Sequence, residues 1–227
     1  MADKKLYTEK SIESLSPLEF TRLRPGVYCG DTTYATQLLV EIVSNAIDEF
    51  RLGHGNKIDI TINKDIVSVR DYGQGFIPNS FRDDGKTILE AAFSVLNTSG
   101  KYREDGAYEG TSLGSFGIGS KITTYLSHWL KVWTIRDNKF EQVKFKEGVF
   151  EERLSGIDKG PSGTYVEWQP SEEFFAHTEV EINKIKELFK TITCLCPGLT
   201  INLDDNGSKT SYFSEHGLMD YVDEGVK

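Results

Sequence analysis

EIVSNAIDE, residues 41–49, predicts a helix with two chemically different faces. With 3.6 residues per turn, the apolar side chains gather in one stripe. The stripe consists of Leu39, Ile42, Val43, Ala46, Ile47 and Phe50, and the polar face opposite it of Glu41, Ser44, Asn45, Asp48 and Glu49. An exposed helix face usually places Lys or Arg three or four residues from each acid, but no basic residue follows here until Arg51. The polar face is therefore either an ordinary solvated surface or a face that binds a ligand.

The length and charge of the chain limit its possible functions. At 227 residues it is long enough for one domain that buries roughly 70% of its unfolded surface. Its net charge of -9 repels phosphate backbones, so any contact with DNA is expected through other parts of the protein. No apolar run approaches the roughly 20 residues that span a bilayer, and the polar start MADKKLYTEK is not a signal peptide. We expect a cytoplasmic domain that is not inserted in a membrane.

The cysteines and histidines give little support for metal or histidine chemistry. One C-x-C pair and one further thiol cannot complete a tetrahedral zinc site, so we expect buried free thiols at Cys29, Cys194 and Cys196. The histidines are scattered along the chain, which gives a His-based catalytic apparatus no local signature. They are His54, His128, His177 and His216.

Local signals predict helices early in the chain and strands in its middle. The capping box at residues 16–19 starts a short helix towards Arg24, and a long helix follows over about residues 34–52. Alternation of apolar and polar residues predicts a hairpin at 57–63 and 65–71. Further helices are predicted over 86–97, 120–129 and 179–193, with a last short one near the C-terminus, and strands over 130–137, 139–145, 148–154, 163–169, 199–203 and 209–213.

This order of elements predicts the fold class. The four strands from 130 to 169 are spaced like an antiparallel meander. Residues 98–118 are rich in glycine and longer than most structureless loops, which is typical of a lid. We therefore predict an α+β fold, a two-layer sandwich with a mostly antiparallel mixed sheet and helices on one face.

Asp71-Tyr72-Gly73-Gln74-Gly75 closes the second strand of the hairpin. Two glycines at this spacing let the backbone turn sharply and approach a ligand. Asp71 follows a strand containing Val67 and Val69, so its carboxylate is expected to enter an apolar pocket, where it needs a donor. The exocyclic amine of adenine is a suitable donor, although a simple glycine turn with a solvated Asp has the same pattern.

Residues 114–119, GSFGIG, stand directly before a helix. Free backbone N–H groups and a helix N-terminus would converge there without side chains in the way, which makes an anion cradle. The pattern is neither a Walker A motif nor a dinucleotide fingerprint, because Ser120 separates Gly119 from Lys121 and no strand precedes the glycines. Taken alone, the pattern is weak and fits a flexible loop better than a phosphate site.

The order of the three motifs is more specific than any one of them. An acidic and amide row, then D-x-G-x-G, then G-x-x-G-x-G resembles the ATPase superfamily of gyrase, a heat-shock chaperone, MutL and sensor histidine kinases. Within it, RPGVYCGD at 24–31 and EIVSNAIDE at 41–49 resemble R-P-G-M-Y-I-G-D and E-V-V-D-N-A-I-D-E of the bacterial type IIA topoisomerase B subunits, those of gyrase and topoisomerase IV. GKY at 100–102 and SGT at 162–164, followed by WQP at 168–170, resemble G-G-K-F, T-G-T and F-W-P. The resemblance runs from about Tyr7 to the C-terminus.

The resemblance implies a role for each of these residues. Glu41 is the general base that activates the attacking water, and Asn45 binds Mg²⁺ on the triphosphate. Asp71 takes the adenine amine, with Gly75 and Thr164 around a structural water and Glu49 and Gln74 at the floor of the pocket. The adenine walls are Val43, Val69, Ile77 and Val166. The phosphate loop comprises Leu113, Gly114, Ser115, Phe116, Gly117, Ile118 and Gly119.

More distant parts of the family's site are also implied. Lys101 and Tyr108 belong to the lid, and Tyr7 belongs to an arm that crosses to the nucleotide of the partner subunit. Arg136 lies at the rim where aminocoumarin antibiotics bind in the family. The chain departs from the family at Gln74, where Arg usually pairs with Glu49, and Phe76-Ile77-Pro78 is one residue longer than G-I-P.

The resemblance thus implies an ATP-binding domain over 1–227, with ATP and Mg²⁺ as cofactors, that powers DNA supercoiling by gyrase or decatenation by topoisomerase IV. The partners implied are the A subunit and, through other domains, DNA. The family's next domain, the transducer, supplies a Lys to the γ-phosphate and is not expected within these residues, so we expect a monomer with weak ATPase activity that dimerises on ATP only in the longer subunit. A phosphotransfer or chaperone module with the same pocket, or a module that binds without hydrolysis, is the alternative.

Overall fold

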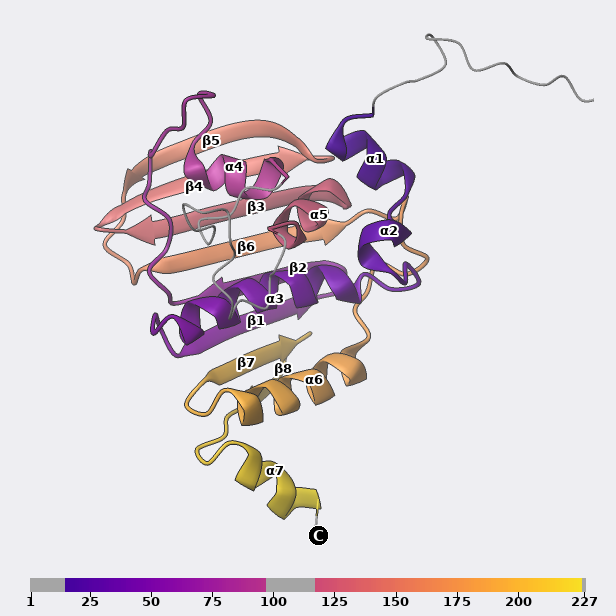
Figure 1. Ribbon diagram of the computed structural model, residues 1–227, viewed down its shortest axis with the longest axis vertical. Coiled ribbons are helices and arrows are strands. Elements are labelled where there is room, and N and C mark those ends of the chain that lie inside the picture. Colours follow the sequence, from indigo (N-terminus) through magenta and orange to yellow (C-terminus); the bar gives the residue numbers. More distant parts are fainter. Residues whose placement is uncertain (1–14, 97–116, 226–227) are drawn as a thin grey trace, which may run out of the picture.

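An eight-stranded sheet carries the helices in the computed structural model, which describes residues 15–96 and 117–225 (Figure 1). Its strand order is β5-β4-β3-β6-β2-β1-β7-β8. The strands are β1 Lys57–Asn63, β2 Ile66–Asp71, β3 Ser127–Arg136, β4 Lys139–Lys146, β5 Val149–Ile157, β6 Gly163–Pro170, β7 Thr200–Asp205 and β8 Ser208–Tyr212. Only β1 and β7 pair in parallel; the other neighbours in this sheet are antiparallel.

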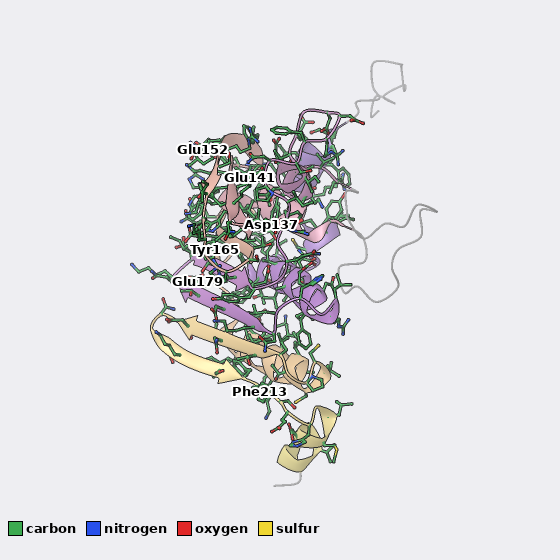
Figure 2. The ribbon with its side chains drawn as sticks, turned by 90° about the vertical axis from the view of Figure 1, so that its left-hand side faces the viewer. Asp137, Glu141, Glu152, Tyr165, Glu179 and Phe213 are labelled. Carbon is green, nitrogen blue, oxygen red and sulfur yellow. The ribbon has the colours of Figure 1, made fainter. Side chains whose placement is uncertain are left out.

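The helices form a second layer over the sheet, which Figure 2 shows from the side, except for the last one, which packs on the helix before it. They are α1 Pro17–Leu23, α2 Gly26–Cys29, α3 Thr36–Arg51, α4 Ile88–Ser94, α5 Gly119–Tyr125, α6 Ile182–Leu195 and α7 Leu218–Gly225. The predicted capping box is present, because the Ser16 hydroxyl accepts the Glu19 N–H and the Glu19 carboxylate accepts the Ser16 N–H. The predicted α+β class is therefore confirmed. Among the described residues, no helix is long and apolar enough to cross a membrane.

The stripe predicted for α3 forms the centre of the core. Leu39, Ile42, Val43 and Ile47 are buried in one cluster with side chains from the sheet. Asp48, however, was predicted on the polar face and is only 2% exposed. The helix α3 packs against α5 as well as β1 and β2, so its covered surface is wider than one apolar stripe.

Two predictions in the middle of the chain were wrong. The helix expected over 120–129 ends at Tyr125, and Ser127 already belongs to β3, where pairing with β6 replaces helical hydrogen bonds. The expected meander holds only for β3, β4 and β5, because β6 pairs with β3 and β2 instead of β5. Burial explains this order: Trp168 of β6 is fully buried, whereas every residue of β5 is exposed, as suits an edge strand.

Candidate active site

Glu41 lies half-buried on α3 and is held by a side chain one helical turn earlier. The Gln37 amide donates to Glu41 Oε1 at 2.6 Å. Asn45, one turn later, is exposed on the same helix. Gln37 therefore fixes one carboxylate oxygen of Glu41, and Asn45 presents its amide to solvent beside it.

The third motif meets Glu41 at the start of α5. A Cβ atom added to Gly119 would lie only 2.0 Å from Glu41 Oε2 and 3.1 Å from Glu41 Cβ, so the two residues are in direct contact and any larger residue would displace the carboxylate. Gly117 has a φ of 60°, in the left-handed region that glycine adopts without strain. The N-cap position, Ile118, makes no side-chain capping hydrogen bond. The structure thus brings together the acidic row and the end of the glycine-rich motif.

Asp71 stands at the end of β2 and ties the second motif to β6. Its Oδ1 accepts the N–H of Gly73 at 2.9 Å and the N–H of Thr164 at 3.1 Å. Burial raises the pKa of the Asp71 carboxyl to about 6, against the lowering effect of these two hydrogen bonds. The negative charge of Glu49 raises this pKa further. The site therefore contains a carboxylate that is costly to ionise without another donor.

Both glycines of the D-x-G-x-G motif are required by close contacts. A Cβ on Gly73 would lie 2.9 Å from Glu49 Oε2 and 3.1 Å from Asp71 Oδ1. Gly75 has a φ of 70°, and a Cβ there would lie 2.7 Å from the Ile135 carbonyl oxygen. The backbone of this motif consequently packs directly on the ends of α3 and β3.

Sequence reasoning missed the partner of Glu49. The His54 Nδ1 atom lies 3.3 Å from Glu49 Oε2, and the Gln74 backbone N–H donates to the same oxygen at 3.4 Å. The Gln74 side chain, predicted at the floor of the pocket, belongs to an exposed residue. His54 follows the end of α3 by three residues, and no pattern in the sequence distinguishes it from the other histidines.

Three of the four predicted adenine walls gather beneath Asp71. Val43, Val69 and Val166 are buried in one cluster, and Val69 pairs with Val166 across β2 and β6. Ile77 does not join them, because it is 52% exposed. The additional residue in this loop places Phe76 against the core in its stead.

Arg136 lies beside the second motif, at the end of β3. Its Nη1 donates to the Gly75 carbonyl at 3.2 Å, and its Nε lies 3.7 Å from Asp137 Oδ2. Arg136 is thus placed next to Gly75, and its role at the rim of the pocket stays a prediction.

Several predicted site residues lie outside the described residues. They are Tyr7, Lys101, Tyr108, Leu113, Gly114, Ser115 and Phe116. Of the glycine-rich motif, the structure describes Gly117, Ile118 and Gly119. Within 15–96 and 117–225, no group of three or more His, Cys, Asp or Glu side chains could hold a metal ion. The cysteines Cys29, Cys194 and Cys196 are buried and free, as predicted.

The fold is that of the ATPase domain of type IIA topoisomerase B subunits. The 43K ATPase domain of Thermus thermophilus gyrase B, solved with an aminocoumarin, superposes with a TM-score of 0.77 over 92% of this chain and 55% of that one, at 24% identity. In sequence, the B subunit of DNA topoisomerase 4 from Mycoplasma capricolum is 36% identical over 100% of this chain. The B subunit from Staphylococcus aureus is 36% identical over 96% of this chain. The B subunit of the same enzyme from Streptococcus pneumoniae is 33% identical over 95% of the chain.

The chain is therefore a homologue of the type IIA topoisomerase B subunits, which confirms the family predicted from its motifs. It spans about a third of the length of these relatives, 34% to 36%. No protein-family model matches it.

The raised pKa of Asp71 predicts how Asp71→Asn changes stability. The unfolded chain releases this proton near its ordinary pKa of 3.8 and the folded chain near 6, so wild-type stability falls as the pH rises between these values. Asn keeps an oxygen for both N–H donors but carries no charge. We expect the advantage of the variant to grow from pH 4 to pH 7, towards at most about 3 kcal/mol. Urea unfolding at both pH values measures it.

The exposed neighbour Asp137 supplies the control for this experiment. Its side chain is 83% exposed, so Asp137→Asn should give no comparable pH-dependent gain. A difference between wild type and Asp71→Asn that is the same at pH 4 and pH 7 would show that burial does not raise this pKa.

The contact between Gly119 and Glu41 predicts an energetic coupling. Gly119→Ala should destabilise the wild type because its Cβ collides with the Glu41 carboxylate, and should cost less beside Glu41→Ala, where only the Cβ of residue 41 remains, 3.1 Å away, and where Ala favours the helix. A double-mutant cycle by chemical unfolding should give a coupling of about 1–3 kcal/mol. Gly26→Ala, whose Cβ would meet nothing within 4 Å, is the control and should combine additively with Glu41→Ala.

Proposed function

We propose that this chain is the ATP-binding and ATP-hydrolysing domain of a type IIA topoisomerase B subunit. The observation that carries the proposal is that α3 contacts both glycine motifs: Glu41 lies against Gly119 at the start of α5, and Glu49, two turns later, lies against Gly73 beside Asp71. Adenine requires an acceptor for its amine such as Asp71, the attacking water requires a base such as Glu41, and phosphate groups require free N–H donors such as those at the start of α5. The relation to topoisomerase B subunits supports the same conclusion.

Asp71 is suited to recognise the adenine base. Both of its hydrogen bonds within the described chain end on Oδ1, which leaves Oδ2 for the exocyclic amine. The valines beneath it provide apolar surface for the ring. The adenine amine would donate a hydrogen bond to the Asp71 carboxylate and so offset the cost of its charge. The empty site is electrostatically unfavourable, and binding of adenine relieves this.

Glu41 is suited to act as the general base. Gln37 holds Oε1, and Oε2 lies against Gly119, where the helix N-terminus and its uncapped N–H groups attract phosphate. A water between Glu41 and the γ-phosphate would then be oriented for attack. Asn45 fits a hard cation that retains most of its waters, and Mg²⁺ held there would neutralise charge on the triphosphate.

The role of the whole protein is a further part of the proposal. ATP hydrolysis would drive DNA strand passage together with an A subunit, through parts of the protein that contact DNA, and ATP would promote dimerisation of the B subunits. The sequence relatives are topoisomerase IV subunits and the fold neighbour is a gyrase subunit, so decatenation and supercoiling are both candidate outputs. Assaying both reactions with the cognate A subunit distinguishes them.

Glu41→Gln separates binding from hydrolysis. Gln keeps the size of the side chain and its contact with Gly119 but cannot take a proton from water. We expect affinity for a non-hydrolysable ATP analogue to stay close to wild type, while single-turnover hydrolysis falls about 10²- to 10⁴-fold. Loss of binding together with hydrolysis would remove Glu41 from the base role, and unchanged hydrolysis would place the general base at another residue. A wild type that binds the analogue but does not hydrolyse ATP would instead be a module that only binds.

Asp71→Asn should affect binding in the opposite direction from stability. The amide gives the adenine amine a weaker acceptor, and a hydrogen bond to a charged group is worth roughly 1.5 to 3 kcal/mol, or about 10- to 150-fold in affinity. The variant should therefore bind ATP more weakly although its fold is more stable at neutral pH. Calorimetric titration with ATP measures this, and an unchanged dissociation constant would place the adenine elsewhere. Asp137→Asn serves again as the exposed control.

A further inference from the structure

A row of polar residues crosses the sheet under the segment that follows Asp71. Strand pairing sets Thr164 of β6 opposite Thr134 of β3, and Thr134 opposite Glu141 of β4. Each of them hydrogen-bonds to the segment. Thr164 donates its N–H to Asp71, Thr134 Oγ1 accepts the Phe76 N–H at 2.8 Å, and Glu141 Oε2 accepts the Asn79 N–H at 2.6 Å. The segment from Asp71 to Asn79 is thus fixed at three successive strands.

Glu141 fixes a second point as well. Its Oε1 accepts the Thr87 hydroxyl, and Thr87 in turn caps α4 by accepting the Glu90 N–H at 3.1 Å. Asn79 and Thr87 are the two ends of one loop, which the Ile88 N–H to Ser80 carbonyl bond closes. One carboxylate therefore holds the exit of the pocket segment and the start of α4 together.

The surroundings of Glu141 are those of a core position. It is 0% exposed and lies on the same face of β4 as Val143 and Phe145, which belong to the hydrophobic core (Figure 2 labels Glu141). Burying a carboxylate is costly unless its oxygens are hydrogen-bonded, and an apolar residue would fill the same place without that cost. What the carboxylate provides, and an apolar residue cannot, is a pair of acceptors at fixed positions for the loop.

We propose that Glu141 is a positioning residue of the nucleotide site, which acts through the backbone of residues 75–79. The inference rests on the proposed ATP-binding function. Both oxygens of Glu141 are occupied within the protein, so it does not touch the nucleotide. It keeps Gly75, Phe76 and Asn79 in register with Asp71, so that the wall of the pocket is formed before the nucleotide binds.

Four variants test this role in the 227-residue chain. Glu141→Leu removes both acceptors at similar volume. Glu141→Gln is the conservative rescue, because its amide oxygen can accept the Asn79 N–H and its NH₂ can donate to Thr87. Thr87→Val removes one of the two bonds of Glu141, together with the cap of α4, and covers the case in which Glu141→Leu does not fold. Val143→Ala is the matched control: it weakens the same strand by a cavity but touches no loop hydrogen bond.

The readouts are affinity for a non-hydrolysable ATP analogue and amide hydrogen exchange at Phe76 and Asn79. We expect Glu141→Leu to weaken the analogue roughly tenfold or more and to speed exchange at Asn79, because a small misplacement of the binding groups is enough for such a loss. Thr87→Val should show a smaller change in the same direction. Glu141→Gln and Val143→Ala should bind like the wild type.

Other outcomes would overturn the inference. Wild-type affinity in Glu141→Leu, or in Thr87→Val where Glu141→Leu does not fold, would mean that Glu141 is not needed to position the site. An equal loss in Val143→Ala would mean that general destabilisation is responsible. If the wild type itself does not bind the analogue, the proposed function fails and the role of Glu141 fails with it. If the wild type binds and all four variants bind equally well, only the role of Glu141 is removed.

Discussion

The hydrogen bonds to Asp71 Oδ1 are the constraint on which the site depends. They join the last residue of β2 to the start of β6 and to the glycine turn in between, and all three have to be in place for the carboxylate to be buried. Gly163, at the start of β6, has a φ of 138°, and a Cβ there would lie 2.2 Å from the Asp71 carbonyl. The close packing of these backbones thus explains why glycines surround an acid here.

The sequence predicts the local elements of this fold better than their pairing. The α3 stripe and the hairpin of β1 and β2 follow from periodicity, which is a property of neighbouring residues. The insertion of β6 between β2 and β3 depends on contacts between residues far apart in the chain, which no local pattern encodes. Ser127 shows the same limit. The residues before it have a helical pattern, which predicted a helix through Ser127, but pairing with β6 places it in β3.

For the site, the residue types in the three motifs could be predicted, but not the side chains that support them. Glu41 and Gly119 lie in contact, and Asp71 ends β2 beside its glycine turn, as the local pattern of each motif predicts, whereas their roles toward a nucleotide stay predictions. The contact of His54 with Glu49 could not be predicted, because it forms across a helix end between residues with no shared pattern. Phe76 replaced Ile77 against the core for a related reason: one additional residue in a loop changes which side chain faces inward.

The partly buried carboxylate of Asp71 and the fully buried one of Glu141 show how the hydrogen bonds of an acid distinguish a binding role from a supporting one. Asp71 receives both of its bonds on one oxygen, so the other is available to a ligand, and burial raises its pKa as long as no ligand donor is present. Glu141 receives one bond on each oxygen, both from the loop that it holds. A buried acid with an unused acceptor is destabilising until a donor binds, whereas one with both oxygens occupied fixes its surroundings permanently. The difference assigns Asp71 to the ligand and Glu141 to the wall around it, although both are carboxylic acids and lie in one sheet.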